Sequence, residues 1–494
     1  MQERIFGTES EYALFFHNEG QKDLACLGDE AFLEHLKGVT PLLLQALAAQ
    51  GQPLAGEFLG NGGRFYIDHG GHPEYATPEC RSLRDLVVHE KAGDRLAQTL
   101  VESARTILAQ SGRSECLHLF KNNVDAFGNS YGAHENYLVT PAVMPRIPAI
   151  LPFFVTRQIF AGAGKVCRDA SGEAPYRVSQ RADFLDRVFS DRTSRVRGII
   201  NTRKREIPKY GQNLRLHLIF GDANLSEYAL RLKFGTTALV LRLLEEGALD
   251  DFPALPHPVQ AVKRISARLD APLGLEGRSG NYTALDIQRL FLEKARQFFS
   301  SRRPQPDERK TLALWEATLE GLAGLAVSWA AGVLEDDPAG LRRRLDWLLK
   351  LWLLNRAQQK HGFGWDDPRS RLLDMKYHDL DPETGLFARC LKLDLTDRLV
   401  DDAEVLRAQK EPPRDTRACL RAQIIRCARG KAVEVHVEDW EKINLTTDWQ
   451  ARRNIHFFEG TRKLANRLKI RLEDPFQAEA PEILESVQAF LENC

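Results

Sequence analysis

The sequence of 494 residues is poor in cysteine, and its few cysteines are not spaced to form a disulfide framework or a zinc site. The eight cysteines fall at positions 26, 80, 116, 167, 390, 419, 427 and 494, with no CxxC pair among them. A chain of this length can bury a large apolar core without disulfides. We therefore interpret the cysteines as reduced residues that mostly serve packing.

Long apolar runs and an excess of charge are also missing. No apolar run approaches the length of a membrane span, and the segment from Met1 to Glu9 lacks the apolar core of a signal peptide. The 68 Lys and Arg residues balance the 68 Asp and Glu residues, whereas nucleic-acid-binding proteins usually carry a basic excess. These absences predict a globular cytoplasmic protein with neither a membrane nor a nucleic acid among its partners.

Several familiar nucleotide-binding and catalytic motifs are absent as well. The sequence has no GxGxxG after a strand, no HRD or DFG set and no HExxH. The segment from Gly162 to Lys165 is similar to a phosphate-binding loop, but the leading glycine is missing and Val166 stands where Ser or Thr should bind magnesium. If the protein uses ATP, acidic residues on a sheet must hold the phosphates through metal ions.

Three segments alternate with period two, which predicts β-strands that each carry one polar face. They span residues 4–14, 64–68 and 214–220. The polar residues expected to share a face within each strand are Glu9 with Glu11, Arg64 with Tyr66 and Asp68, and Arg215 with His217.

Two neighbouring segments extend this polar set. A loop rich in glycine and ionisable groups, at residues 68–75, contributes Glu74. A further strand at residues 134–140 places His134 and Asn136 on one face and Glu135 on the other, and either face could join the polar set. His134 and His217 could contact metal or phosphate, or could be hydrogen-bonded core histidines.

The collected residue types suit a site for metal and phosphate. Carboxylates without cysteines are ligands for hard cations such as magnesium, and arginines bind phosphate oxygens. The alternative is a set of solvated groups on the open face of an antiparallel sheet. Arg181 and Arg203 follow short polar turns and could bind phosphate or a substrate carboxylate, or form surface ion pairs. Trp440, in a mostly polar segment, could stack on a purine or lie in the core.

Amphipathic segments and one linker candidate indicate the domain organisation. Helices are expected at about residues 82–110, 227–246, 285–299, 311–334 and 341–358. The best linker candidate is the proline-containing stretch at residues 411–414. We therefore expect a catalytic domain at residues 1–419 and a small C-terminal domain at residues 420–494.

Motifs that follow one another along nearly the whole chain resemble the Pup ligase and Pup deamidase family, in which Pup is the prokaryotic ubiquitin-like protein. They include GTESEY at residues 7–12, NGGRFYID at 61–68, HPEYATPEC at 72–80, GNSYG at 128–132, SQR at 179–181, INTR at 200–203 and VEDW at 437–440. The resemblance implies an α+β fold similar to glutamine synthetase. Such a fold has a curved antiparallel β-sheet flanked by helices and a small C-terminal domain that contributes to the nucleotide site.

The resemblance also implies an activity, cofactors and partners. Ligase members of the family use ATP and Mg²⁺ to phosphorylate the side-chain carboxylate of the C-terminal glutamate of Pup, and a lysine amine then displaces phosphate. Other members deamidate a C-terminal glutamine of Pup or remove Pup from conjugates. The expected partners are therefore Pup or a Pup-like modifier and lysine-bearing target proteins.

Individual roles follow from the positions that match the family motifs. Asp68 would be the catalytic base, and Arg64 and Thr77 would contact ATP. Trp440 would approach the nucleotide from the C-terminal domain. The candidate metal contacts are Glu9, Tyr66 and Glu74 by resemblance, together with Glu11, His134 and His217 from the predicted strand faces. The candidates for binding substrate or phosphate are Arg181, Arg203 and Arg215.

The sequence combines features of both branches of the family. The short segment at residues 13–59, the three residues between Asp68 and His72, and the VEDW ending favour a ligase. NNVD at residues 122–125, GDANL at 221–225 and GWD at 364–366 look more like the deamidase branch. The segment from Lys204 to Pro208 replaces an acidic run that follows Asn-Thr-Arg in both branches.

We therefore predict a ligase and keep three alternatives. These are a Pup deamidase or depupylase, a small-molecule carboxylate-amine ligase, and a non-catalytic adaptor. An adaptor is disfavoured, because it would not need a base and metal carboxylates together.

Overall fold

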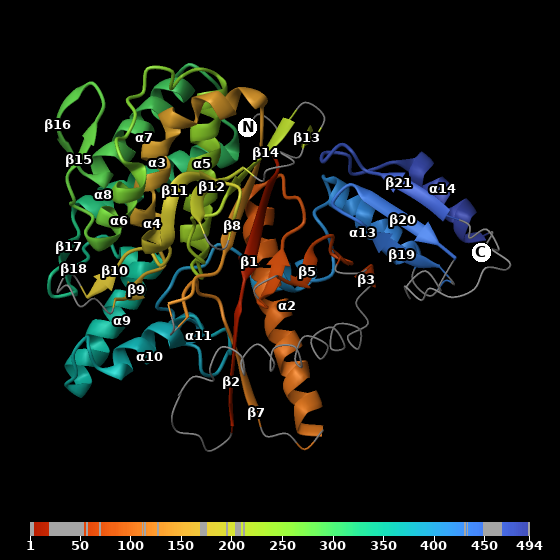
Figure 1. Ribbon diagram of the computed structural model, residues 1–494, viewed down its shortest axis with the longest axis horizontal. Helices are drawn as coiled ribbons and strands as arrows, with labels where there is room; N and C mark the ends of the chain where they lie inside the picture. The colour runs from red at the N-terminus through yellow and green to blue at the C-terminus, as the bar shows by residue number, and fades with distance from the viewer. Residues whose placement is uncertain are drawn as a thin grey trace.

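The computed structural model has one large β-sheet at its centre (Figure 1). It describes residues 4–18, 54–55, 58–68, 71–110, 112, 115–125, 128–167, 175–193, 196–202, 209–210, 213–428, 431, 433–447 and 467–492. Within these residues, ten strands form the sheet in the order β11-β12-β14-β8-β1-β6-β5-β4-β3, with β13 paired to β14. The strands are β1 (Phe6–Glu11), β3 (Leu54–Ala55), β4 (Phe58–Leu59), β5 (Arg64–Ile67), β6 (Pro73–Ala76), β8 (Ala133–Val139), β11 (Leu185–Ser190), β12 (Arg197–Asn201), β13 (Lys209–Tyr210) and β14 (Asn213–Leu218).

The sheet is antiparallel except at one end, where β11 and β12 run parallel. Helices cover one of its faces. The predicted α+β class, an antiparallel sheet flanked by helices, is therefore confirmed.

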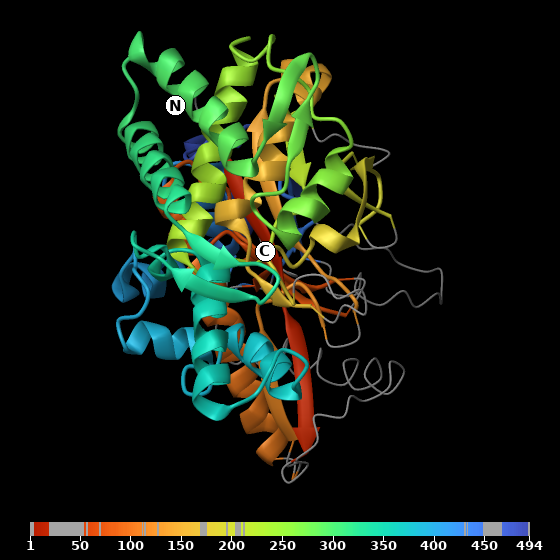
Figure 2. The same ribbon diagram turned by 90° about the vertical axis from the view of Figure 1, so that its left-hand side faces the viewer.

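The predicted strand at residues 4–14 is divided into two. After β1, the chain passes Tyr12 and continues as β2 (Ala13–Asn18), which pairs with β7 (Glu115–Phe120) rather than with the central sheet. The two strands follow one another nearly end to end and are drawn in red in Figure 2. The period-two pattern is continuous because both strands are extended, but the change of partner depends on residues far away in the sequence.

Two helices pack directly behind the centre of the sheet. The long α2 (Leu83–Gln110) contacts β1, β6 and β7, and α5 (Glu227–Glu245) packs against α2. The sheet face towards them carries the buried side chains of Phe6, Tyr75 and Tyr137. This face holds the main core, so the opposite face is the one that can carry polar groups.

The remaining helices and short strands surround this centre. The helices are α3 (Ile147–Thr156), α4 (Gln158–Ala161), α6 (Pro258–Ala267), α7 (Ala284–Ser300), α8 (Pro306–Ala323), α9 (Asp346–His361), α10 (Pro368–Tyr377), α11 (Leu386–Lys392) and α12 (Asp402–Ala408). The short strands are β9 (Lys165–Val166), β10 (Tyr176–Arg177), β15 (Leu273–Leu275), β16 (Arg278–Tyr282), β17 (Ala326–Ser328) and β18 (Val333–Asp336).

One predicted helix is wrong in its second half. The segment at residues 311–334 is helical only until α8 ends at Ala323, and β17 and β18 then form a hairpin. Gly324 caps the helix, and Gly332 has a φ of +64°, a conformation that few other residues adopt.

The C-terminal elements form a smaller unit beside the sheet (Figure 1). They are α13 (Arg417–Cys427), the antiparallel strands β19 (Glu434–Val437), β20 (Lys442–Thr446) and β21 (Arg467–Arg471), and α14 (Pro481–Glu492). Ile424, Leu445 and Val487 belong to a hydrophobic cluster of this unit, to which β4 adds Phe58. The division between residues 419 and 420 stays a prediction.

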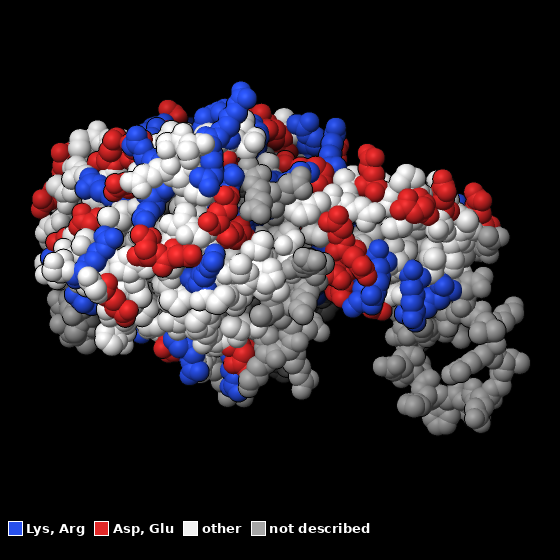
Figure 3. Space-filling view, turned by 90° about the horizontal axis from the view of Figure 1, so that it is seen from above, with Lys and Arg blue, Asp and Glu red and all other residues white. Residues whose placement is uncertain are grey.

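The surface and the helices agree with the balanced composition. Basic and acidic side chains are interspersed over the face seen in Figure 3. Among the helices that the structure describes, none is long and apolar enough to cross a bilayer.

Candidate active site

The strand register brings the predicted polar residues onto one face of the sheet. Glu9 lies opposite His134 on β8 and Ala76 on β6, and directly opposed residues of antiparallel strands share a face. Alternation along each strand extends that face in both directions. Its polar members are Glu9, Glu11, Arg64, Tyr66, Glu74, His134, Asn136, Arg215 and His217.

Glu9 lies at the centre of this face and contacts four side chains. Its Oε2 atom is 3.2 Å from Nδ1 of His134 and 3.6 Å from Nε2 of His217. Its Oε1 atom accepts hydrogen bonds from the Arg215 guanidinium and, at 3.1 Å, from the Asn136 amide. Burial alone would raise the pKa of Glu9, but the Arg215 charge and the histidine contacts hold it well below the usual value. Glu9 is therefore an anion at neutral pH.

Glu9, His134 and His217 are arranged as a metal site would require. One ligand atom from each lies within 4.8 Å of the others. The His217 ring is buried, yet neither of its nitrogens has a hydrogen-bond partner among the described residues. Burial and the Arg215 charge lower the pKa of His217 to about 3, so the ring is neutral and can donate a lone pair to a cation.

Three carboxylates crowd the same region. Glu74 shares a hydrogen bond with Tyr66, and Glu11 accepts one at 2.7 Å from the Gly132 amide. Burial, together with the charges of Glu9 and Glu11, raises the pKa of Glu74 well above its usual value. A hard cation bound here would relieve that repulsion, so the donor set fits Mg²⁺.

Glycine is required at one point of this site. A Cβ atom on Gly132 would lie 2.4 Å from Nε2 of His134 and 2.7 Å from Oε1 of Glu11. The GNSYG segment thus lets the backbone approach two candidate metal contacts closely.

Asp68 follows the last residue of β5, at the rim of the polar face. Its amide donates to the His72 carbonyl at 2.9 Å, and the His72 amide donates to Asp68 Oδ1 at 2.7 Å. The His72 ring stacks on Tyr131, with centroids 4.4 Å apart, and its Nδ1 is 3.1 Å from the Tyr12 carbonyl oxygen. Sequence reasoning used His72 only as a spacing marker, but in the structure it holds the turn that presents Asp68.

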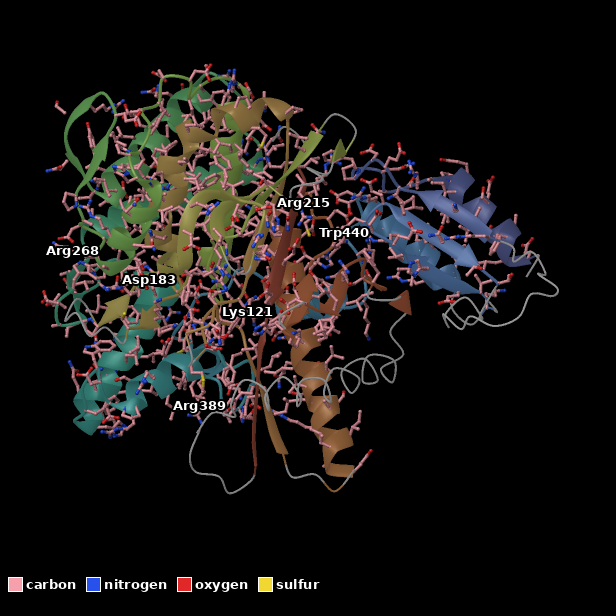
Figure 4. All side chains as sticks on the ribbon, in the orientation of Figure 1. Lys121, Asp183, Arg215, Arg268, Arg389 and Trp440 are labelled. Carbon is pink, nitrogen blue, oxygen red and sulfur yellow. The ribbon has the colours of Figure 1, made fainter. Side chains whose placement is uncertain are left out.

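A pocket lies between the sheet and the C-terminal unit. Its lining includes Thr77, Arg215 and Trp440, three residues predicted to bind nucleotide or phosphate, and it reaches Glu9. Ile5, Leu138 and Pro475 add apolar walls. In Figure 4, Arg215 and Trp440 lie near one another where the two parts of the molecule meet. An aromatic ring, apolar walls and a guanidinium beside an acidic face suit a nucleoside triphosphate.

Arg64 lies between the acidic face and the Trp440 side of the pocket. Its guanidinium stacks over the Tyr66 ring at 4.2 Å and lies 5.7 Å from the Phe58 centroid. The Phe58 ring packs edge to face on Trp440, with centroids 5.1 Å apart. Thr77 is buried, and its hydroxyl accepts from the Thr8 amide at 3.0 Å.

Of the two arginines predicted after short polar turns, the structure describes only Arg181. Arg181 is buried and donates to the Tyr131 carbonyl, so it is not a surface ion pair. Burial lowers its pKa to about 10, partly offset by the Glu11 charge, which leaves it a cation at neutral pH. Arg203 lies outside the described residues.

A second polar network lies behind the sheet, and sequence reasoning missed it. Glu90 of α2 accepts hydrogen bonds from the Thr8 and Ser10 hydroxyls of β1 and, at 2.6 Å, from the Lys121 ammonium. Lys121, labelled in Figure 4, also donates to Asp94 at 2.7 Å. The signal was a pair of acids four residues apart on the buried face of a predicted helix.

The geometry can be compared with known proteins. The family model described as Pup-ligase protein matches residues 4–444. The Pup--protein ligase of Acidimicrobium ferrooxidans is 37% identical over 481 residues, which cover 96% of each chain. The Pup--protein ligase of Kineococcus radiotolerans is 39% identical over 461 residues, 92% of this chain and 96% of the relative.

Solved structures of Pup ligases are also similar to this chain. One is the crystal structure of the complex between the prokaryotic ubiquitin-like protein Pup and its ligase PafA. It matches with a TM-score of 0.82 at 31% identity and covers 99% of this chain and 92% of the other. The structure of the Pup ligase PafA in complex with ADP matches with a TM-score of 0.74 at 31% identity, covering 96% of each chain.

Proposed function

This chain belongs to the Pup-ligase family, and from that membership we propose that it is an ATP-dependent ligase for protein modification. The ligase joins the C-terminal glutamate of Pup or a Pup-like modifier to lysine side chains of target proteins through an isopeptide bond. The observation that carries the proposal is a single sheet face that combines buried carboxylates with a pocket lined by Thr77, Arg215 and Trp440.

The reaction has two steps. In the first, an oxygen of the glutamate side-chain carboxylate attacks the γ-phosphorus of ATP. The bond between the γ-phosphorus and the oxygen that bridges it to the β-phosphate breaks, and ADP leaves. In the second, a lysine amine attacks the carbonyl carbon of the acyl phosphate, and the carbon–oxygen bond to phosphate breaks. The products are an amide, ADP and phosphate.

The chain's own residues divide these tasks. Trp440 and Thr77 bind and orient the nucleotide, and the guanidinium groups of Arg64 and Arg215 bind phosphate oxygens. Asp68 accepts the proton that the lysine ammonium must lose before its nitrogen can attack. The buried Arg181, and Arg203 outside the described residues, bind the substrate carboxylate or phosphate.

The acidic face suits Mg²⁺, which supplies charge that offsets the negative charge of the transferring phosphoryl group when it is bound. The crowded carboxylates support this assignment. The residues that would hold the ion are Glu9, Glu11, Tyr66, Glu74, His134 and His217.

The proposed domains divide the site between them. Residues 1–419 supply the acidic face and Asp68, and residues 420–494 supply Trp440. This division agrees with the separate hydrophobic cluster of the C-terminal elements and with the pocket between the two parts.

A paired assay tests the proposed function. The purified chain is incubated with ATP, Mg²⁺, a lysine-bearing target and a modifier that ends in glutamate, and a modifier truncated by that glutamate serves as the control. Mass spectrometry should find a modifier–lysine conjugate only with the intact modifier and ATP. Conversion of a terminal glutamine to glutamate, or release from preformed conjugates without conjugate formation, would assign the chain to the hydrolytic branch instead.

A further inference from the structure

We propose that Glu79 is a positioning residue that fixes Trp440 on the nucleotide pocket by holding two arginines of α13. The inference deepens the proposed function and rests on it, because it concerns how the nucleotide part of that site is assembled. None of the roles predicted from the sequence involved Glu79, Arg417 or Arg421.

One carboxylate binds both guanidinium groups. Glu79 Oε1 accepts from Nε of Arg417 at 2.7 Å and from Nη1 of Arg421 at 3.2 Å, and Oε2 accepts from Nη2 of Arg421 at 2.5 Å. The two arginines are four residues apart and so lie on one face of α13. The Thr416 hydroxyl, just before the helix, donates to the Glu79 carbonyl at 2.9 Å.

Each arginine also binds a backbone carbonyl of the C-terminal unit. Arg421 donates to the Trp440 carbonyl at 3.0 Å, and its guanidinium carbon lies 5.0 Å from the Trp440 ring centroid. Arg417 donates to the Leu472 carbonyl at 2.9 Å, just beyond β21. Glu79 therefore holds Trp440 through Arg421 and holds the end of β21 through Arg417.

The same network reaches the sheet side of the pocket. Arg421 donates to the Gly62 carbonyl at 2.7 Å, two residues before Arg64. Glu79 itself lines the pocket beside Thr77 and Pro78, and Arg417 lines it as well. The Glu79 carboxylate thus connects the sheet segments that carry Arg64 and Thr77 with the C-terminal unit that carries Trp440.

Burial makes this connection stiff. Glu79 is 8% exposed, Arg417 1% and Arg421 0%. The two arginines outweigh the effect of burial and lower the pKa of Glu79 to about 2, so the carboxylate stays ionised at any working pH. A buried ion pair is weak evidence for stability, and the role assigned to this one is to fix a single arrangement of the two parts.

A double-mutant cycle on nucleotide affinity tests the proposal. The variants are Glu79→Gln, Trp440→Ala and both together, with calorimetric ADP affinity and the KM for ATP as readouts. Base stacking on an aromatic side chain is worth about 1–3 kcal/mol, so either single variant should weaken binding by about 5- to 150-fold. Because Glu79 acts through Trp440, the double variant should bind about as weakly as Trp440→Ala alone. At saturating ATP, kcat should change less than KM.

The matched control is Glu308→Gln, which removes a different ion pair, between the buried Glu308 and the partly buried Arg242 at 2.5 Å; neither residue lines the pocket. It should leave ADP affinity unchanged. If Glu79→Gln does not fold, Arg421→Lys replaces it, because a lysine cannot bind the same four oxygens in the same geometry.

The outcomes separate this inference from the proposed function. Affinity losses that multiply in the double variant, or an unchanged affinity in Glu79→Gln, would overturn the positioning role. A wild-type chain that binds ADP but forms no conjugate would contradict the proposed function and leave the cycle measurable. A wild-type chain that binds no ADP would overturn the inference as well.

Discussion

At the scale of single residues, the site depends on side chains whose surroundings fix their charge. Glu9 stays ionised because Arg215 and two histidines face it, whereas Glu74 is pushed towards its neutral form by burial and by the neighbouring carboxylates. His217 stays neutral because burial and Arg215 both oppose its protonation. One face therefore offers an anion and a neutral ring to a cation.

Asp68→Asn tests the assignment of the base. Proton removal by a positioned group contributes about a hundred- to ten-thousand-fold, so the rate of conjugate formation should fall by that factor. The KM for ATP should change little, because Asp68 does not line the pocket. The residual rate should rise with pH, since alkali removes the lysine proton without help.

The control for that variant is Asp270→Asn. Asp270 pairs with Arg268 at 2.7 Å on an exposed surface, and Arg268 is labelled in Figure 4 far from Arg215 and Trp440. The Asp270→Asn variant should form conjugates at the wild-type rate. An Asp68→Asn protein that forms conjugates at the wild-type rate would remove Asp68 from the role of base.

At the scale of elements, the strands were predictable and their partners were not. The period-two pattern correctly placed Glu9 with Glu11 and Arg215 with His217, because side-chain alternation follows from strand geometry alone. Neither the change of partner between β1 and β2 nor the hairpin after α8 can be read from a local pattern. These features depend on tertiary pairing and on turn residues.

The candidate site, too, could be predicted from the sequence only in part. Residues on regular strands could be grouped from the sequence. The contact of Glu79 with Arg417 joins residues 338 positions apart, and no local spacing indicates it. The network behind β1 could be suspected only from two acids on a buried helix face.

The Lys121 network makes a prediction for the attachment of α2 to β1. Lys121→Met leaves the buried Glu90 without its cation, while Asp94 keeps only Lys91, at 3.0 Å. Breaking a buried pair in this way costs about 3–5 kcal/mol. Burial raises the pKa of Glu90, but the Lys121 charge outweighs this effect and lowers the pKa to about 2. The ionised carboxylate therefore depends on that cation. Urea denaturation should show the loss in the free energy of unfolding.

Lys294→Met is the matched control, because Lys294 pairs at 2.9 Å with the exposed Asp251. Exposed ion pairs contribute about 0–1 kcal/mol, so its stability should stay near that of the wild type. Equal losses in the two variants would show that Lys121 does not stabilise the buried carboxylates of α2.

At the scale of the whole molecule, buried histidines make the fold sensitive to acid. Burial lowers the pKa of His89 in α2 to about 3, against 6.5 for a free histidine. Between these values the unfolded chain binds a proton that the folded chain does not. The free energy of unfolding therefore falls as pH decreases below 6.5, by up to about 1.4 kcal/mol per pH unit for this one group.

His89→Gln should remove that contribution. The slope of unfolding free energy against pH, measured near pH 5.5 by urea denaturation, where an unfolded histidine is mostly protonated, should be smaller than in the wild type by up to about 1.4 kcal/mol per pH unit. The variant His361→Gln, at an exposed position of α9, should keep the wild-type slope. An unchanged slope in His89→Gln would mean that His89 takes up its proton in the folded state.

The whole-molecule arrangement also explains why two units are needed. The sheet supplies the acidic face and Asp68, and the C-terminal unit supplies Trp440, so the pocket exists only where they meet. In the proposed function, the tie through Glu79 would keep the nucleotide beside the residues assigned to activate the carboxylate.

In the proposed reaction, ATP activates a carboxylate, which an amine then attacks. The most direct measurement labels the glutamate side-chain carboxylate of the modifier with a heavy oxygen isotope and follows the label during conjugation. Each conjugate formed should release one phosphate that carries a single labelled oxygen, because that oxygen bridges carbon and phosphorus in the acyl phosphate. Conjugates that form while the released phosphate stays unlabelled would contradict the proposed reaction.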